Sequence, residues 1–298
     1  MPEPIDIIFL GTGCGIPSLS RHHPAILLHK AGDYILFDCG ESCQLQLDKA
    51  GVSPMRISKI FITHWHADHF AGLLPLIETL QLSKRQAPLE IYGPEASRFV
   101  SALLKLSYFG VSFKIIAKNC SCRKTEKIFE TDQYKIFSVP VKHSVPAVGY
   151  CFEEKAHWKI DLSLAKKFGL KAGPLLQKIK QDKKLKIGKL VIKLEDIAHM
   201  SKGRKIVYSG DSLVCKSLFL AAKGADILIH DATFIEPMPE RPHSSVIEVS
   251  KLAKEYGIKR LILTHLSRRY KSSKEILNVA KPIFKNVVIA EDLMKVRT

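Results

Sequence analysis

Three imidazoles and one carboxylate lie within six positions of one another, at His64, His66, Asp68 and His69. Nitrogen and oxygen donors of this kind suit zinc and other divalent metals. His64 and His66 are two residues apart, so an extended backbone would direct both rings to one side, with Asp68 and His69 on the turn that follows. A single His-x-His would also be typical of a surface loop. The full pattern is more specific, and it predicts two metal ions side by side.

The cluster follows an apolar, β-branched run, Ile60-Phe61-Ile62-Thr63, which predicts a buried strand. Later apolar runs also end in a residue that can bind metal or move a proton. Singly, such a histidine would fit a core and such an aspartate a helix cap. Strand ends along one sheet edge, however, are where an α/β fold gathers distant residues into a pocket. The five strands deliver His64, His143, Asp211, His230 or Asp231, and His265.

The clustered pattern resembles the metallo-β-lactamase superfamily. The resemblance implies an α/β fold, an αββα sandwich formed by residues 1–298 as a single domain, with a two-metal site at one edge between the sheets. It implies two Zn²⁺ per subunit, although the same donors also suit manganese or iron. A shared water would be activated to hydroxide near neutral pH, with Asp68 as its proton acceptor. In the implied assignment, one ion takes His64, His66 and His143, the other takes Asp68, His69 and His265, and Asp211 bridges them.

The composition is that of an ordinary globular protein, with 46% hydrophobic and 25% charged residues among 298. This length allows one large α/β domain or two small ones. The N-terminus has no basic leader-like segment and no apolar run approaches the length of a membrane span, which predicts a cytoplasmic protein without a membrane partner. Seven scattered cysteines, an odd number, favour reduced thiols over a disulfide framework.

Strand and helix patterns alternate along the chain. Asp38, after the predicted strand 34–37, could hold a ligating histidine by accepting its second ring proton, cap the next helix, or do both. Further strands are predicted at 5–10, 25–28, 60–63, 89–92, 134–143, 148–152, 205–211, 226–233 and 260–265. Helices are predicted through Leu47, up to about Leu82, from Pro94 to about Tyr108, and at 215–223, 245–256 and 274–284.

Positive charge is concentrated in one segment. The chain has 46 Lys and Arg against 29 Asp and Glu, a net charge of +17. The stretch 155–193 holds twelve lysines and two acidic residues, which accounts for +10 of that excess. This density favours a polyanionic partner, because attraction to phosphates supplies most non-specific affinity for nucleic acid. We therefore predict a basic inserted arm at residues 153–193, with a solvated, partly disordered insertion as the alternative.

Further motifs resemble the ribonuclease Z family over nearly the whole chain, from Phe9 to Tyr270. They are Phe37-Asp38-Cys39-Gly40-Glu41, the His64–His69 cluster, Tyr208-Ser209-Gly210-Asp211, His230-Asp231-Ala232-Thr233, His243-Ser244-Ser245 and the segment from His265 to Tyr270. The resemblance implies an endoribonuclease that removes the 3′ trailer from precursor tRNA by attack of a metal-bridging hydroxide, leaving a 3′-hydroxyl on the tRNA. It also implies a homodimer, in which the arm of one subunit grips tRNA presented to the other. The suggested RNA contacts are Gly173, Pro174, Lys178, Lys180 and Arg269, although Arg269 would also fit an ordinary surface arginine.

Cleavage of a phosphodiester also needs a proton for the leaving oxygen. The resemblance assigns this role to His243, oriented by Asp231, although a residue beside Pro242 would also fit the start of a helix. The family usually carries Glu where this chain has Asp231, which is one methylene shorter. It also has Ser-Thr in place of Ser244-Ser245, and Glu-Gly-Thr in place of Glu41-Ser42-Cys43.

Two other functions would use the same residues. A small-substrate hydrolase of the superfamily, such as a cyclic-nucleotide phosphodiesterase or an arylsulfatase-like enzyme, would share the metal site but has little use for a lysine-rich arm. A nucleic-acid-binding protein with a structural ion would favour a closed, thiolate-rich site, whereas these donors are His and Asp. The arm and the open site therefore favour the tRNA endonuclease.

Overall fold

Two seven-stranded sheets form the centre of the molecule in the computed structural model, which describes residues 4–106, 108, 110–188, 190–238, 240–270 and 272–298. The first sheet has the order β18-β1-β2-β3-β4-β5-β6. Its strands β3 to β6 run parallel, and β18, β1, β2 and β3 pair antiparallel. The bounds are β1 Asp6–Gly11, β2 Ala25–Lys30, β3 Asp33–Phe37, β4 Ile57–Phe61, β5 Leu89–Gly93, β6 Ile115–Asn119 and β18 Lys295–Arg297.

The second sheet has the order β17-β16-β15-β14-β9-β8-β7. Strands β14 to β17 are parallel, while β14, β9, β8 and β7 pair antiparallel. The bounds are β7 Glu126–Glu130, β8 Tyr134–Pro140, β9 Val148–Glu154, β14 Lys205–Tyr208, β15 Ile227–Asp231, β16 Leu261–Thr264 and β17 Val287–Ile289.

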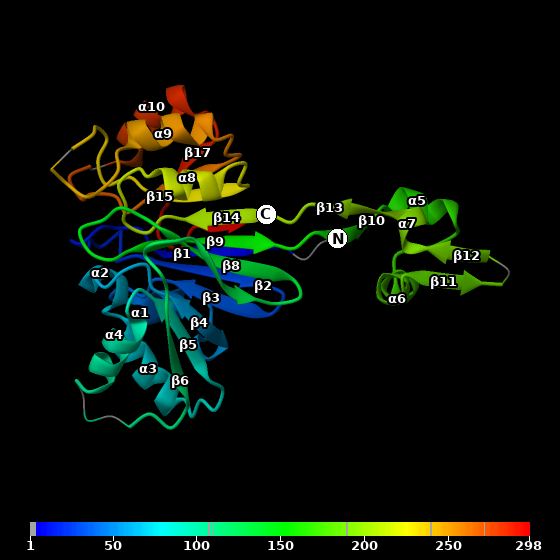
Figure 1. The fold of residues 1–298 in the computed structure, drawn as a ribbon, viewed down its shortest axis with the longest axis horizontal. Helices are drawn as coiled ribbons and strands as arrows, with labels where there is room; N and C mark the ends of the chain where they lie inside the picture. Colours follow the sequence, from blue (N-terminus) through cyan, green and yellow to red (C-terminus); the bar gives the residue numbers. More distant parts are fainter. Residues whose placement is uncertain (1–3, 107, 109, 189, 239, 271) are drawn as a thin grey trace.

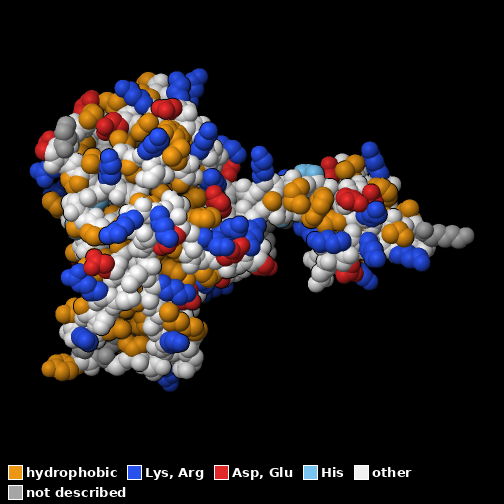
Figure 2. Space-filling model, viewed as in Figure 1, with side chains coloured by type: hydrophobic (Ala, Val, Ile, Leu, Met, Phe, Trp, Pro, Cys, Tyr) orange, Lys and Arg blue, Asp and Glu red, His pale blue; other side chains and the backbone are white. Residues whose placement is uncertain are grey.

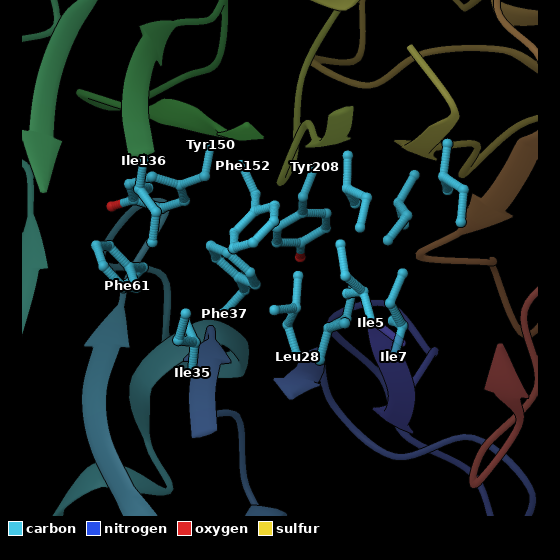
Figure 3. Packing of buried hydrophobic residues seen from close by; sticks show 14 of the residues in the cluster. Ile5, Ile7, Leu28, Ile35, Phe37, Phe61, Ile136, Tyr150, Phe152 and Tyr208 are labelled. Carbon is cyan, nitrogen blue, oxygen red and sulfur yellow. The ribbon is translucent and has the colours of Figure 1, made fainter. Parts of the chain in front are cut away.

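Residues along the central strands alternate between two apolar layers. In β1, Ile7 packs between the sheets and Ile8 packs on the opposite face, under the helices. Both faces are covered, so these strands are apolar at nearly every position. Figure 3 shows the layer between the sheets, where Phe37 of the first sheet meets Tyr150 and Tyr208 of the second. This layer fixes how the two sheets sit against each other.

Helices cover the outer face of each sheet (Figure 1), which confirms the predicted αββα sandwich. The helices α1 (Cys43–Lys49), α3 (Leu73–Leu82) and α4 (Ala96–Leu104) pack on the first sheet. The helices α8 (Lys216–Ala222), α9 (Val246–Glu255) and α10 (Ser273–Ile283) pack on the second. The short helices η1 (Pro54–Arg56) and α2 (Ala67–Phe70) lie before and after β4. None of the helices in the described part of the chain has the length and apolar character that a membrane crossing requires.

An arm leaves the second sheet between β9 and β14 and projects from the body (Figure 1). Its stalk pairs β10 with β13, and its distal part has an apolar core of its own that includes Leu176, Ile179, Ile192 and Ile197. The segment is therefore folded in its described residues, and it extends past the predicted end at 193 because β13 completes the stalk. The bounds are β10 His157–Ile160, α5 Leu162–Lys167, α6 Pro174–Asp182, β11 Lys184–Ile187, β12 Leu190–Lys193, α7 Leu194–Ile197 and β13 Ala198–Ser201.

A buried ion network lies at the root of the arm. The carboxylate of Glu154, at the end of β9, accepts hydrogen bonds from Nε and Nη2 of Arg204, both at 2.6 Å, and lies 2.8 Å from Nζ of Lys30. Burial alone would raise the pKa of Glu154, but the hydrogen bonds from Arg204 and Lys30 lower it to about 2. The two chain segments that enter and leave the arm are therefore tied together where they meet the body.

The strands absent from the sequence prediction of the body are the four sheet edges, β6, β7, β17 and β18. Strands β6, β7 and β18 carry charged residues, so their hydrophobic pattern is weak, whereas β17 is apolar but only three residues long. The predicted helix from Pro94 to about Tyr108 is too long, since α4 runs from Ala96 to Leu104. The helix begins at Ala96 and not at Pro94, because Glu95 has a left-handed φ of 49°, which does not fit a right-handed helix.

Candidate metal centre

The three histidines of the first predicted metal group come together. His64 lies on the loop after β4, His66 precedes α2, and His143 lies on the loop between β8 and β9. The Nε2 atoms of His64 and His143 each lie 3.1 Å from Nδ1 of His66. These three nitrogens form one of the groups in the structure that could hold a metal ion.

The second predicted group lies beside the first and consists of Asp68, His69, Asp211 and His265. Oδ1 of Asp211 is 3.1 Å from Nε2 of His69, and its Oδ2 is 3.1 Å from Nε2 of His265. Oδ2 of Asp68 lies 3.6 Å from His69 Nε2 and 3.5 Å from His265 Nε2. Asp211 Oδ2 is also 3.9 Å from His64 Nε2, so this carboxylate is the link between the two groups.

The two groups meet because their residues follow strands of both sheets at the same edge. His64 to His69 follow β4 of the first sheet, whereas Asp211 and His265 follow β14 and β16 of the second. The backbone between the halves is tight at Gly210, where φ is 60° and an added Cβ would lie 2.6 Å from Cβ of Thr63. A side chain at position 210 would therefore push the two halves of the site apart.

Hydrogen bonds orient four of the histidine rings in the site. Nδ1–H of His69 donates to Asp38 Oδ2 at 2.8 Å, as predicted for Asp38, and Nδ1–H of His143 donates to the carbonyl of Pro242 at 3.0 Å. The Nδ1–H groups of His64 and His265 face the hydroxyls of Thr63 at 3.0 Å and Thr233 at 2.9 Å. In each ring the remaining Nε2 lone pair is thereby directed into the site, which is the role of outer partners in metal centres.

The electrostatics of the site fit bound cations. His69 Nε2 and Asp211 Oδ1 are buried and 3.1 Å apart, but neither has a hydrogen bond of good geometry in the described part of the chain. Burial lowers the pKa of His64 well below its usual value, which keeps the ring neutral as a metal ligand must be. Burial opposes charge on His69 as well, but Asp211 and Asp38 outweigh it and raise the pKa of that ring. Positive charge is therefore favoured where the carboxylates converge, and the donor set is one that two divalent ions accept.

A histidine–carboxylate pair lies at the mouth of the site. Nδ1–H of His243 donates to Asp231 Oδ2 at 2.8 Å, so the shorter aspartate does reach the ring. The other oxygen of Asp231 accepts from the backbone N–H and the hydroxyl of Thr233, at 2.9 and 2.7 Å. Although burial favours the neutral acid, the hydrogen bonds from His243 and His265 keep the pKa of Asp231 below its usual value. The pair therefore presents an oriented imidazole backed by an ionised carboxylate.

Strand geometry decides between His230 and Asp231. In β15, Ile227 and Ile229 face the layer between the sheets, so Asp231 continues that face toward the site. His230 points the other way, stacks on Phe219 at 5.5 Å between ring centroids, and is fully buried. It is a core histidine that takes no part in the pocket.

The site opens into a cavity of about 420 Å³. Its lining includes Asp68, Asp211 and His243 together with Arg269 and Arg241. The guanidinium carbon of Arg269 lies 4.9 Å from the ring centroid of Phe234, which holds the charge at the rim of the cavity. Arg269 is a predicted RNA contact, whereas Arg241 is not, because a lone arginine in a loop has no sequence pattern that would single it out.

The remaining predicted RNA contacts lie elsewhere. Gly173 and Pro174 start α6 in the arm, and Lys178 and Lys180 are exposed on that helix. The arm leaves the body at the end of β9, on the side away from α2, the short helix that carries Asp68 and His69 (Figure 1). Sequence reasoning also misses Thr63 and Thr233 as partners of the histidine rings. Thr63 directly precedes the predicted ligand His64, and Thr233 ends the motif His230-Asp231-Ala232-Thr233. These positions could have indicated that both hydroxyls lie beside the site.

The chain matches known proteins over both halves of the site. Residues 5–168 match the family model described as Anti-Pycsar protein Apyc1, and residues 182–266 match the one described as Beta-lactamase superfamily domain. The chain is 38% identical to Ribonuclease Z of Methanothermobacter thermautotrophicus, over 98% of this chain and 96% of the relative. It is 39% identical to Ribonuclease Z of Thermococcus sibiricus, over 98% and 96% of the two chains. Among solved structures, the short form of human tRNase Z is similar with a TM-score of 0.70 and 28% identity, over 98% of each chain.

Proposed function

The chain belongs to the ribonuclease Z family, and from this membership we propose that it is a metal-dependent endoribonuclease that removes the 3′ trailer of precursor tRNA. The observation that carries the proposal is the pair of donor groups joined by Asp211 at the floor of a cavity that also holds His243. We propose two Zn²⁺ per subunit, held by His64, His66 and His143 on one side and by Asp68, His69 and His265 on the other, with Asp211 between. Bound there, such ions neutralise phosphate charge and lower the pKa of water toward about 7.

The protein's own groups would handle the protons of the reaction. Asp68 lies between the rings of His69 and His265 and lines the cavity, so it is placed to accept a proton from the attacking water. His243 in its imidazolium form would donate its Nε2 proton to the 3′ oxygen of the departing tRNA, while Asp231 accepts from Nδ1–H, orients the ring and stabilises its positive charge. Arg269 would contact a phosphate at the rim. The tRNA leaves with a 3′-hydroxyl.

We propose that the basic arm is the handle for the tRNA body. Figure 2 shows Lys and Arg side chains spread over the arm and around its root. Lysines such as Lys178 and Lys180 would act as point charges on backbone phosphates, and Gly173 and Pro174 would bring the backbone of the α6 start close to the RNA. Folded tRNA would be recognised by its shape.

The position of the arm supports a homodimer. β9 separates the arm root from the loop that carries His143, a span of about 20 Å for seven residues, and the arm points away from that end (Figure 1). A tRNA held by the arm is therefore better placed for the site of a second subunit. Mixing subunits that lack the arm with Asp68→Ala subunits tests this. Restored cleavage in the mixed dimers is expected, and no recovery would contradict presentation across subunits.

The remaining expectations are consistent with this function. We propose that residues 1–298 form a single metallo-β-lactamase-like domain with the arm inserted, and that the protein works in the reducing cytoplasm. All seven cysteines are free thiols. The named relatives favour this function over a small-substrate phosphodiesterase or an arylsulfatase-like hydrolase.

A 3′-extended tRNA transcript tests the function directly. Purified protein should cleave it at one position and leave a 3′-hydroxyl on the tRNA, and a chelator should abolish cleavage until Zn²⁺ is restored. Mapping both new ends decides the polarity of the cut. Cleavage that persists in chelator, or a phosphate left on the tRNA, would contradict the proposal.

A further inference from the structure

Three buried tyrosines of the second sheet donate hydrogen bonds across the apolar layer to the first sheet. Tyr208 of β14 donates to Asp38 Oδ2 at 2.8 Å, and Tyr150 of β9 donates to the carbonyl of Ile62 at 2.6 Å. Tyr134 of β8 donates to Asp33 Oδ2 at 2.6 Å, at the far end of β3. Figure 3 shows the ring of Tyr208 reaching from its sheet toward Phe37, with the hydroxyl on the side of the first sheet. Two of these three bonds end beside the metal centre.

Asp38 is the acceptor that connects to both metal groups. Its Oδ2 accepts from Nδ1–H of His69 and from the hydroxyl of Tyr208, each at 2.8 Å. Its Oδ1 accepts from the backbone N–H of Thr63 at 2.8 Å, and the Thr63 hydroxyl donates to the same carboxylate at 3.0 Å. That hydroxyl in turn accepts from Nδ1–H of His64 at 3.0 Å. One carboxylate therefore sets the orientation of a histidine in each group.

The conformation of Asp38 depends on these partners. It is fully buried and has a φ of 56°, a left-handed conformation that is uncommon outside glycine, asparagine and aspartate. Thr63 and His69 both belong to the segment that follows β4, in the first sheet. Among the described residues that donate a hydrogen bond to the Asp38 carboxylate, Tyr208 alone comes from the second sheet. The candidate bridge Asp211 lies three residues after Tyr208.

We propose that Tyr208 is a positioning residue for the metal centre. Through Asp38 it holds the histidines of the first sheet in place against Asp211 and His265 of the second. Without the hydroxyl, a buried carboxylate loses a donor, and the two halves of the site lose the polar tie that runs through Asp38. The inference rests on the metal centre proposed above, and it adds a residue that would touch neither metal nor substrate.

The test compares two tyrosines with the same chemistry and different positions. Tyr208→Phe and Tyr134→Phe each remove one hydroxyl that donates to an aspartate of the first sheet, but only the former borders the site. Zn²⁺ affinity is measured by competition with a chromogenic chelator, and ligand geometry by the visible spectrum of the Co²⁺-loaded protein. Tyr208→Phe should weaken binding of at least one ion by about 10- to 100-fold, the range for outer partners of metal ligands. Tyr134→Phe should lower the melting temperature while leaving metal affinity and spectrum unchanged.

Other outcomes are decisive too. Equal metal affinity in the two variants would overturn the role of Tyr208 and leave the proposed function standing. A wild-type protein that binds no metal would instead refute the metal centre itself. If Tyr208→Phe does not fold, Asp38→Asn is measured in its place, and wild-type affinity for both ions would overturn the inference. Where both fold, the double variant should bind metal no more weakly than Asp38→Asn, because Tyr208 acts through Asp38.

Discussion

Replacing Asp231 with asparagine should slow tRNA cleavage while sparing substrates with an easy leaving group. The amide oxygen can keep the bonds from Thr233. The amide NH₂ would then take the place of Oδ2, which in the native protein accepts a hydrogen bond of 2.8 Å from Nδ1–H of His243. Two donors would meet there, and the ring would lose the carboxylate that stabilises its imidazolium form, which is the acid that protonates the 3′ oxygen. General acid catalysis contributes about two to four orders of magnitude, so kcat on precursor tRNA should fall by about 10²- to 10⁴-fold, or about 3–5 kcal/mol.

The assay compares two substrates. On bis(p-nitrophenyl) phosphate, whose leaving group needs no proton, the same variant should lose less than about tenfold, since only the general acid is affected. Asp226→Asn is the matched control, because Asp226 precedes the same strand at its other end and pairs with Lys259 instead. An equal loss on both substrates would refute the reasoning. Asp231 would then act on the metal centre through Thr233 and His265, and not through His243.

Three further predictions concern metal, substrate and stability. His64→Ala should remove metal and activity together, measured by metal analysis and tRNA cleavage, whereas Asp68→Ala should lower kcat more than tRNA affinity; unchanged turnover in either would contradict the assignment. Replacing residues 157–201 with a short linker should leave nitrophenyl phosphodiester hydrolysis intact and reduce precursor tRNA cleavage by at least about 100-fold, as the loss of many phosphate contacts requires. Glu154→Gln should make the free energy of unfolding less dependent on pH in the acid range. Because the pKa of Glu154 is lowered to about 2, its ionised carboxylate stabilises the fold above about pH 4.3, and this contribution is lost as the pH falls toward 2. The loss should be about 3 kcal/mol in the free energy of unfolding measured by denaturation. Glu153→Gln is the control.

The sequence is most informative where one residue type has one physical use. The His64–His69 spacing and the strand-end positions of Asp211 and His265 predict a common pocket, and the structure brings these residues together. Their roles as ligands stay predictions. Side chains alternate along β15, so His230 and Asp231 must point to opposite faces. The sequence alone does not show that Ile227 and Ile229 lie between the sheets, and without that fact it cannot say which of the two points to the site.

Other features depend on contacts between distant segments. The bond from Tyr208 to Asp38 joins residues 170 positions apart, and no local pattern encodes it. The edge strands β6, β7 and β18 are missed because their charged residues weaken the hydrophobic signal, and β17 is missed because it is only three residues long. The arm continues past residue 193 because β13 must pair with β10 to close the stalk, a requirement of long-range pairing that charge density does not reveal.

The arm sits in the chain as one large hairpin loop. β9 and β14 are adjacent antiparallel strands, with Glu153 opposite Lys205, so the segment 155–204 leaves and re-enters the sheet at neighbouring positions. Closure entropy rises with the logarithm of loop length, and a tenfold shorter connection would change it by only about 2 kcal/mol. Insertions and deletions there are therefore nearly neutral for the fold of the body. Selection can lengthen, shorten or reshape the arm while the scaffold of the body stays the same.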